Sequence, residues 1–145
     1  MAEYLFSMFP GWNHVHPVLV HFTTALLPVS VMSDVLGKFS NRYFLTPAAW
    51  WMILYAALAT PATAAAGWLW AGEITAATGG VEDRVLVMHQ WLGILLAVCC
   101  SALAIWRGRT FMLRRKPDMV YLVAAGLTTL VVFYQGYLGG KMTMG

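Results

Sequence analysis

The chain has 145 residues, of which 60% are hydrophobic and only 10% are charged, and its net charge is +3. This small number of polar side chains cannot cover the surface of a water-soluble globular protein. We therefore expect one integral membrane domain over residues 1–145. The basic balance does not indicate nucleic-acid binding, because cations in a membrane protein mark its sidedness.

The elements begin with an aromatic segment of about 15 residues that is typical of the membrane interface. Four apolar runs long enough to cross a bilayer follow, at residues 17–37, 47–72, 85–106 and 118–140. Pro17 and Pro47 are placed as first-turn prolines, Pro28 predicts a kink, and Asp118 is placed to cap the last helix. We therefore expect an all-α, up-down four-helix bundle that spans the membrane.

Lys and Arg are distributed unequally between the connections. One side holds Lys38, Arg42, Arg107, Arg109, Arg114, Arg115 and Lys116, and the other holds Arg84 and Lys141. The cation-rich side should be cytoplasmic, which predicts a multi-pass protein of the bacterial inner membrane. Both termini and all four histidines then face the outer, periplasmic side. Topology alone accounts for the basic turn after the third helix, without a lipid or a partner.

A weak internal repeat links the two halves of the chain. His21 precedes Gly67 by 46 positions, and His89 precedes Gly136 by 47. Helix pairs of similar length give similar spacings, so the pattern agrees with a repeat without requiring one.

Two histidines carry the candidate site. His21 lies four residues after Pro17, and His89 lies four residues after Val85, so each should sit about 6 Å inside its helix. The first and third helices are diagonal in such a bundle, roughly 11 to 14 Å apart. Two imidazoles with metal–nitrogen bonds of about 2 Å can bridge that gap, so His21 and His89 are the predicted metal ligands.

The surroundings favour a flat ligand, because Gly93 on the His89 face leaves space inward of the ring. Haem b is the predicted cofactor, since the protein need supply only axial ligands, an apolar slot and propionate partners, for which Arg84 and His16 are candidates. Haem c is excluded because no CxxCH motif occurs.

Other interpretations stay open at this point. A histidine near the interface can simply face the headgroups, and His16 in place of His21 can be the first-helix ligand. Copper or zinc would need a third or fourth ligand, and His16 is a candidate, but no carboxylate or thiolate lies at that depth except Glu73 and the loop acids. Asp34 is either a proton relay or a helix-end aspartate near water. Gln90 and Gln135 suit a quinone or a bridge between helices equally.

The opening motif of the first span resembles that of a bacterial family of predicted four-helix inner-membrane proteins, classed as a domain of unknown function. This motif consists of His16, Pro17, Val20, His21 and Phe22. The resemblance extends to His89, which opens the third helix, and to the Gly-x-Leu-Gly-Gly segment at 136–140. The family usually has Pro-Ile at positions 23 and 24 and a further histidine after the double glycine, which this chain replaces with KMTMG. The resemblance implies the fold and the topology. It also makes the positions of His21 and His89 a feature that this chain shares with the family.

Two functions follow as expectations. The first is a haem b-binding subunit, not catalytic alone, that transfers electrons between an outer-face redox partner and quinone or another haem. The alternative is a haem-free structural subunit whose small-residue and aromatic surfaces pack against other helices of a larger membrane complex. In either case lipid and other membrane or periplasmic subunits are the expected partners.

Overall fold

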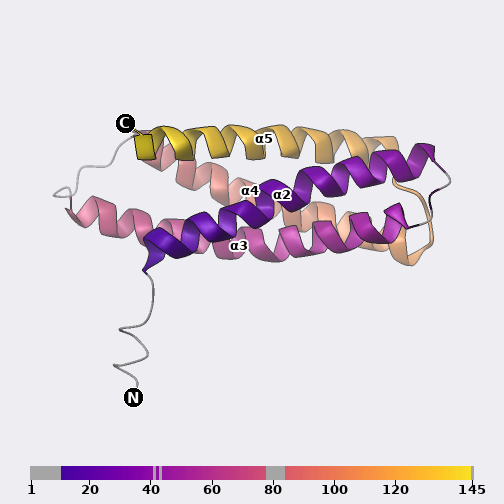
Figure 1. The fold of residues 1–145 in the computed structure, drawn as a ribbon, viewed down its shortest axis with the longest axis horizontal. Coiled ribbons are helices and arrows are strands. Elements are labelled where there is room, and N and C mark those ends of the chain that lie inside the picture. Colours follow the sequence, from indigo (N-terminus) through magenta and orange to yellow (C-terminus); the bar gives the residue numbers. More distant parts are fainter. Residues whose placement is uncertain (1–10, 41, 43, 78–83, 145) are drawn as a thin grey trace, which may run out of the picture.

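The computed structural model describes residues 11–40, 42, 44–77 and 84–144, so the expected interfacial segment lies largely outside the described residues. Four helices make up the fold (Figure 1): α2 (Trp12–Phe39), α3 (Leu45–Ala77), α4 (Arg84–Met112) and α5 (Met119–Met144). The described ranges contain no strand. Each helix is long and apolar enough to cross a membrane, which confirms the all-α, four-span prediction.

The first helix begins earlier than its sequence suggests. Gly11, at φ 79°, occupies the left-handed region that favours glycine, and the chain turns into the helix directly after it. The carbonyl of Gly11 accepts bonds from the backbone N–H groups of His14 and Val15, which closes the first turn. Pro17 is therefore an interior residue and not a first-turn proline.

The bundle has a simple square arrangement. Helix α2 packs against α3 and α5, and α4 packs against the same two neighbours, so α2 and α4 are diagonal. Both run in the same direction in Figure 1. The two histidine-bearing helices are thus parallel and diagonal, as the sequence predicts.

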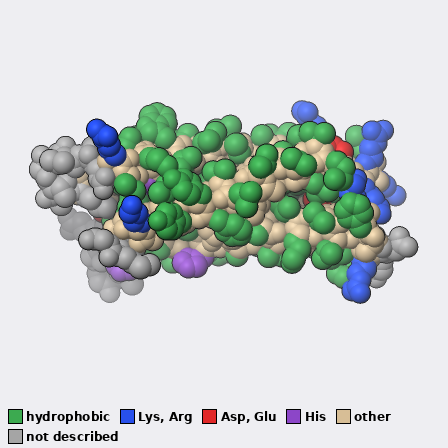
Figure 2. Space-filling view, turned by 90° about the horizontal axis from the view of Figure 1, so that it is seen from above, with side chains coloured by type: hydrophobic (Ala, Val, Ile, Leu, Met, Phe, Trp, Pro, Cys, Tyr) green, Lys and Arg blue, Asp and Glu red, His purple; other side chains and the backbone are tan. Residues whose placement is uncertain are grey.

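The core and the outer surface are both apolar. Buried side chains from all four helices fill the centre, among them Leu27, Ile53, Cys100, Tyr121 and Val132. Large hydrophobic side chains also cover the outside, where Val98 and Leu130 are each 63% exposed. Figure 2 shows this hydrophobic surface along the middle of the molecule, with Lys and Arg gathered at its ends. Such an outward face is stable in contact with lipid, not water.

An ion pair joins the diagonal helices at the cation-rich end. Asp34 of α2 and Arg107 of α4 are fully buried, and the guanidinium donates to the carboxylate through Nε (2.8 Å to Oδ2) and Nη2 (2.7 Å to Oδ1). Arg107 also donates to the carbonyl of Thr46 and to the hydroxyl of Thr110. This geometry corrects two expectations: Asp34 is not a helix-end residue near water, and Arg107 is not an exposed cation of the turn.

Candidate functional site

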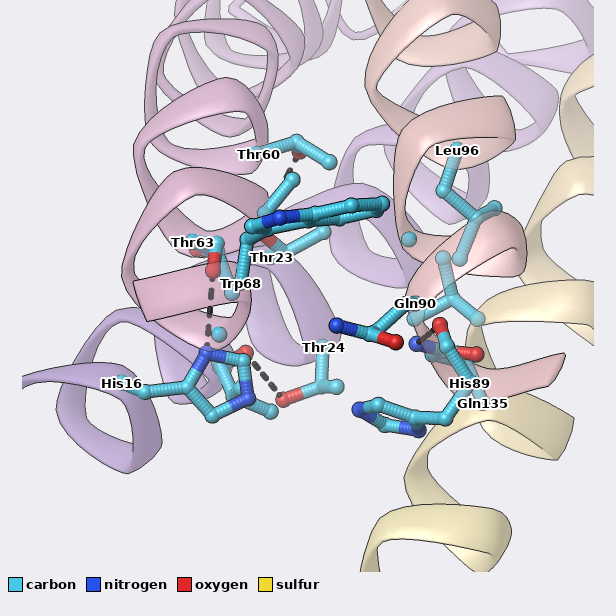
Figure 3. A pocket seen from close by; sticks show the side chains of 15 residues that line it. His16, Thr23, Thr24, Thr60, Thr63, Trp68, His89, Gln90, Leu96 and Gln135 are labelled. Atoms are coloured by element: carbon cyan, nitrogen blue, oxygen red, sulfur yellow. Dashed lines mark hydrogen bonds between the residues drawn. The ribbon is translucent and has the colours of Figure 1, made fainter. Parts of the chain in front are cut away.

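A pocket with a mostly apolar wall and several polar side chains lies at the opposite end of the bundle, where all four helices contribute to its wall. Its volume is about 60 Å³. Figure 3 shows histidine, threonine, glutamine and tryptophan side chains around it. Its polar lining comes from His16, Thr23, Thr24, Thr60, Thr63, His89, Gln90 and Gln135.

His16 is held in one orientation by α3. Its Nδ1 lies 2.9 Å from the carbonyl oxygen of Thr63. A carbonyl oxygen only accepts, so Nδ1 carries the proton, and in the neutral ring Nε2 keeps its lone pair. Gly67 leaves the room for this ring, because a Cβ there would lie 2.6 Å from Cε1 of His16.

His89 faces His16 across the pocket. The ring centroids are 6.2 Å apart and the ring planes are inclined by 72°. Figure 3 shows the two rings turned toward each other from α2 and α4. Nδ1 of His89 is buried and has no hydrogen-bond partner among the described residues. A Cβ at Gly139 would lie 3.3 Å from its Cε1, so a small residue adjoins this ring as well.

His21 does not reach the pocket. Its side chain is exposed, and its Nδ1 lies 2.5 Å from the carbonyl oxygen of Pro17 in its own helix. Five residues separate it from His16, and at 100° per residue they place the two side chains about 140° apart around α2. The expected pairing of His21 with His89 is therefore replaced by a pairing of His16 with His89.

The remaining predicted residues are divided between the pocket and the surface. Gly93 lines the pocket, where a Cβ would lie 3.5 Å from the amide nitrogen of Gln135. Arg84 is the exposed first residue of α4 and does not line the pocket. Gln90 lines it. Gln135 bridges two helices, because its Nε2 donates to the carbonyl of His89 (2.7 Å).

Several polar residues of the site were not predicted from the sequence. The hydroxyls of Thr23 and Thr60 are 3.2 Å apart and connect α2 to α3 just inward of the histidines. A regular spacing in the sequence marks the inward face of α2 and would have indicated these residues. That face carries residues 16, 20, 23, 27, 30 and 34. The same spacing in α4 gives residues 89, 93, 96, 100, 103 and 107. Alternating steps of four and three residues are typical of helix faces that meet in a bundle.

The two imidazoles are the metal ligands that this pocket offers. In the part of the chain that the structure describes, no group of three or more His, Cys, Asp or Glu side chains could hold an ion. A metal here would take two nitrogen ligands from the chain and its other ligands from another source.

The fold and the pocket together define a four-span helical membrane protein with a histidine pair near one end. The chain belongs to a family described as "Predicted membrane protein (DUF2231)", whose model matches residues 13–145. No curated protein and no solved structure matches the chain.

Proposed function

We propose that the chain is a haem b-binding membrane subunit that transfers electrons, in which His16 and His89 would hold the haem iron. The separation of the two rings carries this proposal. A metal–nitrogen bond is about 2 Å, and each ring nitrogen lies roughly 1 Å from its ring centroid, so imidazoles on opposite sides of one metal have centroids roughly 6 Å apart. The observed 6.2 Å fits a single metal between the rings.

The hydrogen bonding of His16 supports the same assignment. Metal-binding histidines usually donate the N–H of the other ring nitrogen to a carbonyl or carboxylate, which fixes the ring and its tautomer. The bond from Nδ1 of His16 to the Thr63 carbonyl is of this kind and directs Nε2 to the pocket. Within the described residues, Nδ1 of His89 and Oε1 of Gln135 are both buried and have no hydrogen-bond partner. The Nδ1–H group of His89 is thus available as a donor, and Oε1 of Gln135 as an acceptor, for a bond like that of His16 to Thr63.

The porphyrin ring needs more room than the iron. Pockets for ligands of this size measure roughly 300 to 1,000 Å³. The present cavity is about 60 Å³. Haem binding would therefore require side chains that line the pocket, such as Trp68, to move. The space at Gly67 and Gly139 is already taken by the rings of His16 and His89, so it gives no room to the porphyrin.

The position of the site suggests how the subunit works. Bound haem would supply one-electron transfer, and the chain would hold and orient the two imidazoles. The cation-rich end should face the cytoplasm of a bacterial inner membrane, which places the pocket near the outer face. There the subunit can anchor a periplasmic redox partner and exchange electrons with quinone or another haem.

The visible spectrum of the purified protein, oxidised and reduced with dithionite, tests the proposal. We expect sharp α and Soret bands at near-stoichiometric haem, abolished or shifted in His16→Ala and in His89→Ala. His21→Ala is the matched control, because it removes an exposed imidazole from the same helix and should leave the bands unchanged. Absence of haem from the wild type, or loss of the bands only in His21→Ala, refutes the assignment.

A second function is favoured by the small volume of the cavity. A haem-free structural subunit needs no larger pocket, and the polar side chains then serve to connect the helices, as Thr23 does with Thr60. Its exposed aromatics, such as the paired rings of Trp68 and Trp91, would pack against other subunits. Metal analysis of the same sample separates the possibilities, since this subunit contains neither haem iron nor a bound ion.

A further inference from the structure

We propose that the cation-rich end binds the phosphate of an anionic phospholipid at the seam between the end of α2 and the start of α5. Basic side chains concentrate at this end, as Figure 2 shows. The exposed ones are Arg42, Arg109, Arg114, Arg115 and Lys116. The inference concerns the opposite end of the bundle from the histidine pocket and does not depend on haem.

Two ammonium groups converge on the seam. Nζ of Lys38 donates to the carbonyl of Pro117 (2.7 Å), and Nζ of Lys116 donates to the carbonyl of Lys38 (3.1 Å). Each bond uses one of the three N–H groups of its ammonium, so each lysine keeps donors for an additional acceptor. The two bonds cross the seam in opposite directions, so both positive charges are held beside it, and a bound anion would offset their mutual repulsion.

The carboxylates at this end are already engaged. Asp34 is paired with Arg107, and Oδ1 of Asp118 accepts the backbone N–H of Tyr121 (2.7 Å) as a helix cap. In the described part of the chain, the pair of Asp34 and Arg107 is the ion pair observed. Neither Lys38 nor Lys116 therefore has an acidic partner there, and the positive charge is available to a ligand.

The surroundings identify the ligand as a lipid. Next to the seam, the first turn of α5 exposes Met119 (54%) and Val120 (68%). A phospholipid matches this combination, because its phosphate reaches the ammonium groups while its acyl chains cover the adjacent apolar surface. A soluble anion would bind only the charged part.

The fixed positions of Lys38 and Lys116 support a bound ligand at the basic turn. Topology explains why cations lie at this end but not why two of them are fixed at one seam by bonds to backbone carbonyls. Those bonds hold Lys38 and Lys116 in place before a ligand arrives, and preorganised donors lose less entropy on binding.

The test uses the purified full chain in detergent, titrated with phosphatidylglycerol or with phosphatidylcholine of the same acyl chains. Bound lipid is counted by native mass spectrometry. We expect phosphatidylglycerol to be retained several-fold more than phosphatidylcholine, and this preference to be lost in Lys38→Gln/Lys116→Gln. The control Arg84→Gln/Lys141→Gln removes the same charge from the other end and should keep the preference.

Two further measurements complete the test. Lys38→Arg/Lys116→Arg preserves the charges and should retain the lipid, which separates loss of charge from misfolding. Inorganic phosphate is added as a competitor and should displace little phosphatidylglycerol. Equal loss in both glutamine pairs, retention in Lys38→Gln/Lys116→Gln, or full displacement by phosphate would each overturn the lipid site. None of these outcomes depends on the visible spectrum, so haem binding and lipid binding fail independently.

Discussion

Replacing Asp34 with Asn tests the importance of the buried ion pair. The substitution keeps the size of the side chain but leaves the guanidinium of Arg107 buried without a counter-charge, and that group cannot deprotonate. The three contacts between the guanidinium and the carboxylate, from 2.7 to 3.0 Å, lose their ionised acceptor, and one of the two acceptor oxygens becomes an NH2 donor. Removing one partner of a buried pair costs about 3–5 kcal/mol. The amide oxygen of Asn can still accept one bond, so we expect about 3 kcal/mol.

The assay is the free energy of unfolding in mixed micelles of a mild detergent and dodecyl sulfate. Asp118→Asn is the matched control, because it makes the same change at an exposed site at the same end, and Asn caps a helix as well as Asp. We expect that control to stay within about 0.5 kcal/mol of the wild type. The double variant Asp34→Asn/Arg107→Met removes both charges and should regain at least half of the loss. A cost below about 1 kcal/mol for Asp34→Asn, or no recovery in the double variant, would refute this reasoning.

Two other substitutions give further predictions. Gly67→Ala places a methyl group 2.6 Å from Cε1 of His16, so it should destabilise the protein by about 1–3 kcal/mol and perturb any metal bound there, whereas Gly72→Ala, with open space around it, should not destabilise. Unfolding and visible spectra of both variants check this, and equal effects would contradict it. Asp118→Ala removes the cap on the N–H of Tyr121 and should cost about 1 kcal/mol, measured as a lower melting temperature than that of Asp118→Asn; equal melting temperatures would exclude the cap.

The four spans and the diagonal placement of the histidine helices could be predicted because apolar length and short connections dictate them. The sequence leaves both His16 and His21 open as the partner of His89, and counting from Pro17 as the first helical residue favours His21. The helix begins at Trp12, so His16 is its fifth residue and His89 is the sixth residue of α4. Their depths match, as expected for His21, but the inward face of α2 passes through His16.

The neighbours of the two rings also revise the internal repeat. Gly67 of α3 adjoins His16, and Gly139 of α5 adjoins His89. The sequence comparison had matched Gly67 with Gly136, because both glycines precede an aromatic residue and leucine. Local sequence similarity does not determine which face of a helix points inward, because that depends on the packing of all four helices.

The ion pair was missed for a related reason. A count of cations by connection places Arg107 with the turn, and nothing local to it reveals a partner 73 positions away. The face of each helix does contain the information, since Asp34 follows His16 by 18 residues and Arg107 follows His89 by 18. At 100° per residue, 18 residues make five full turns, so each pair of side chains points the same way.

This spacing places two contacts between α2 and α4 on one face of each helix. The facing rings of His16 and His89 lie near one end, and the ion pair of Asp34 and Arg107 lies near the other. The two contacts lie about 27 Å apart along each helix, close to the thickness of the hydrocarbon layer of a bilayer. Both contacts therefore fix the same rotation of α2 and α4 about their axes, one near each end of the bundle.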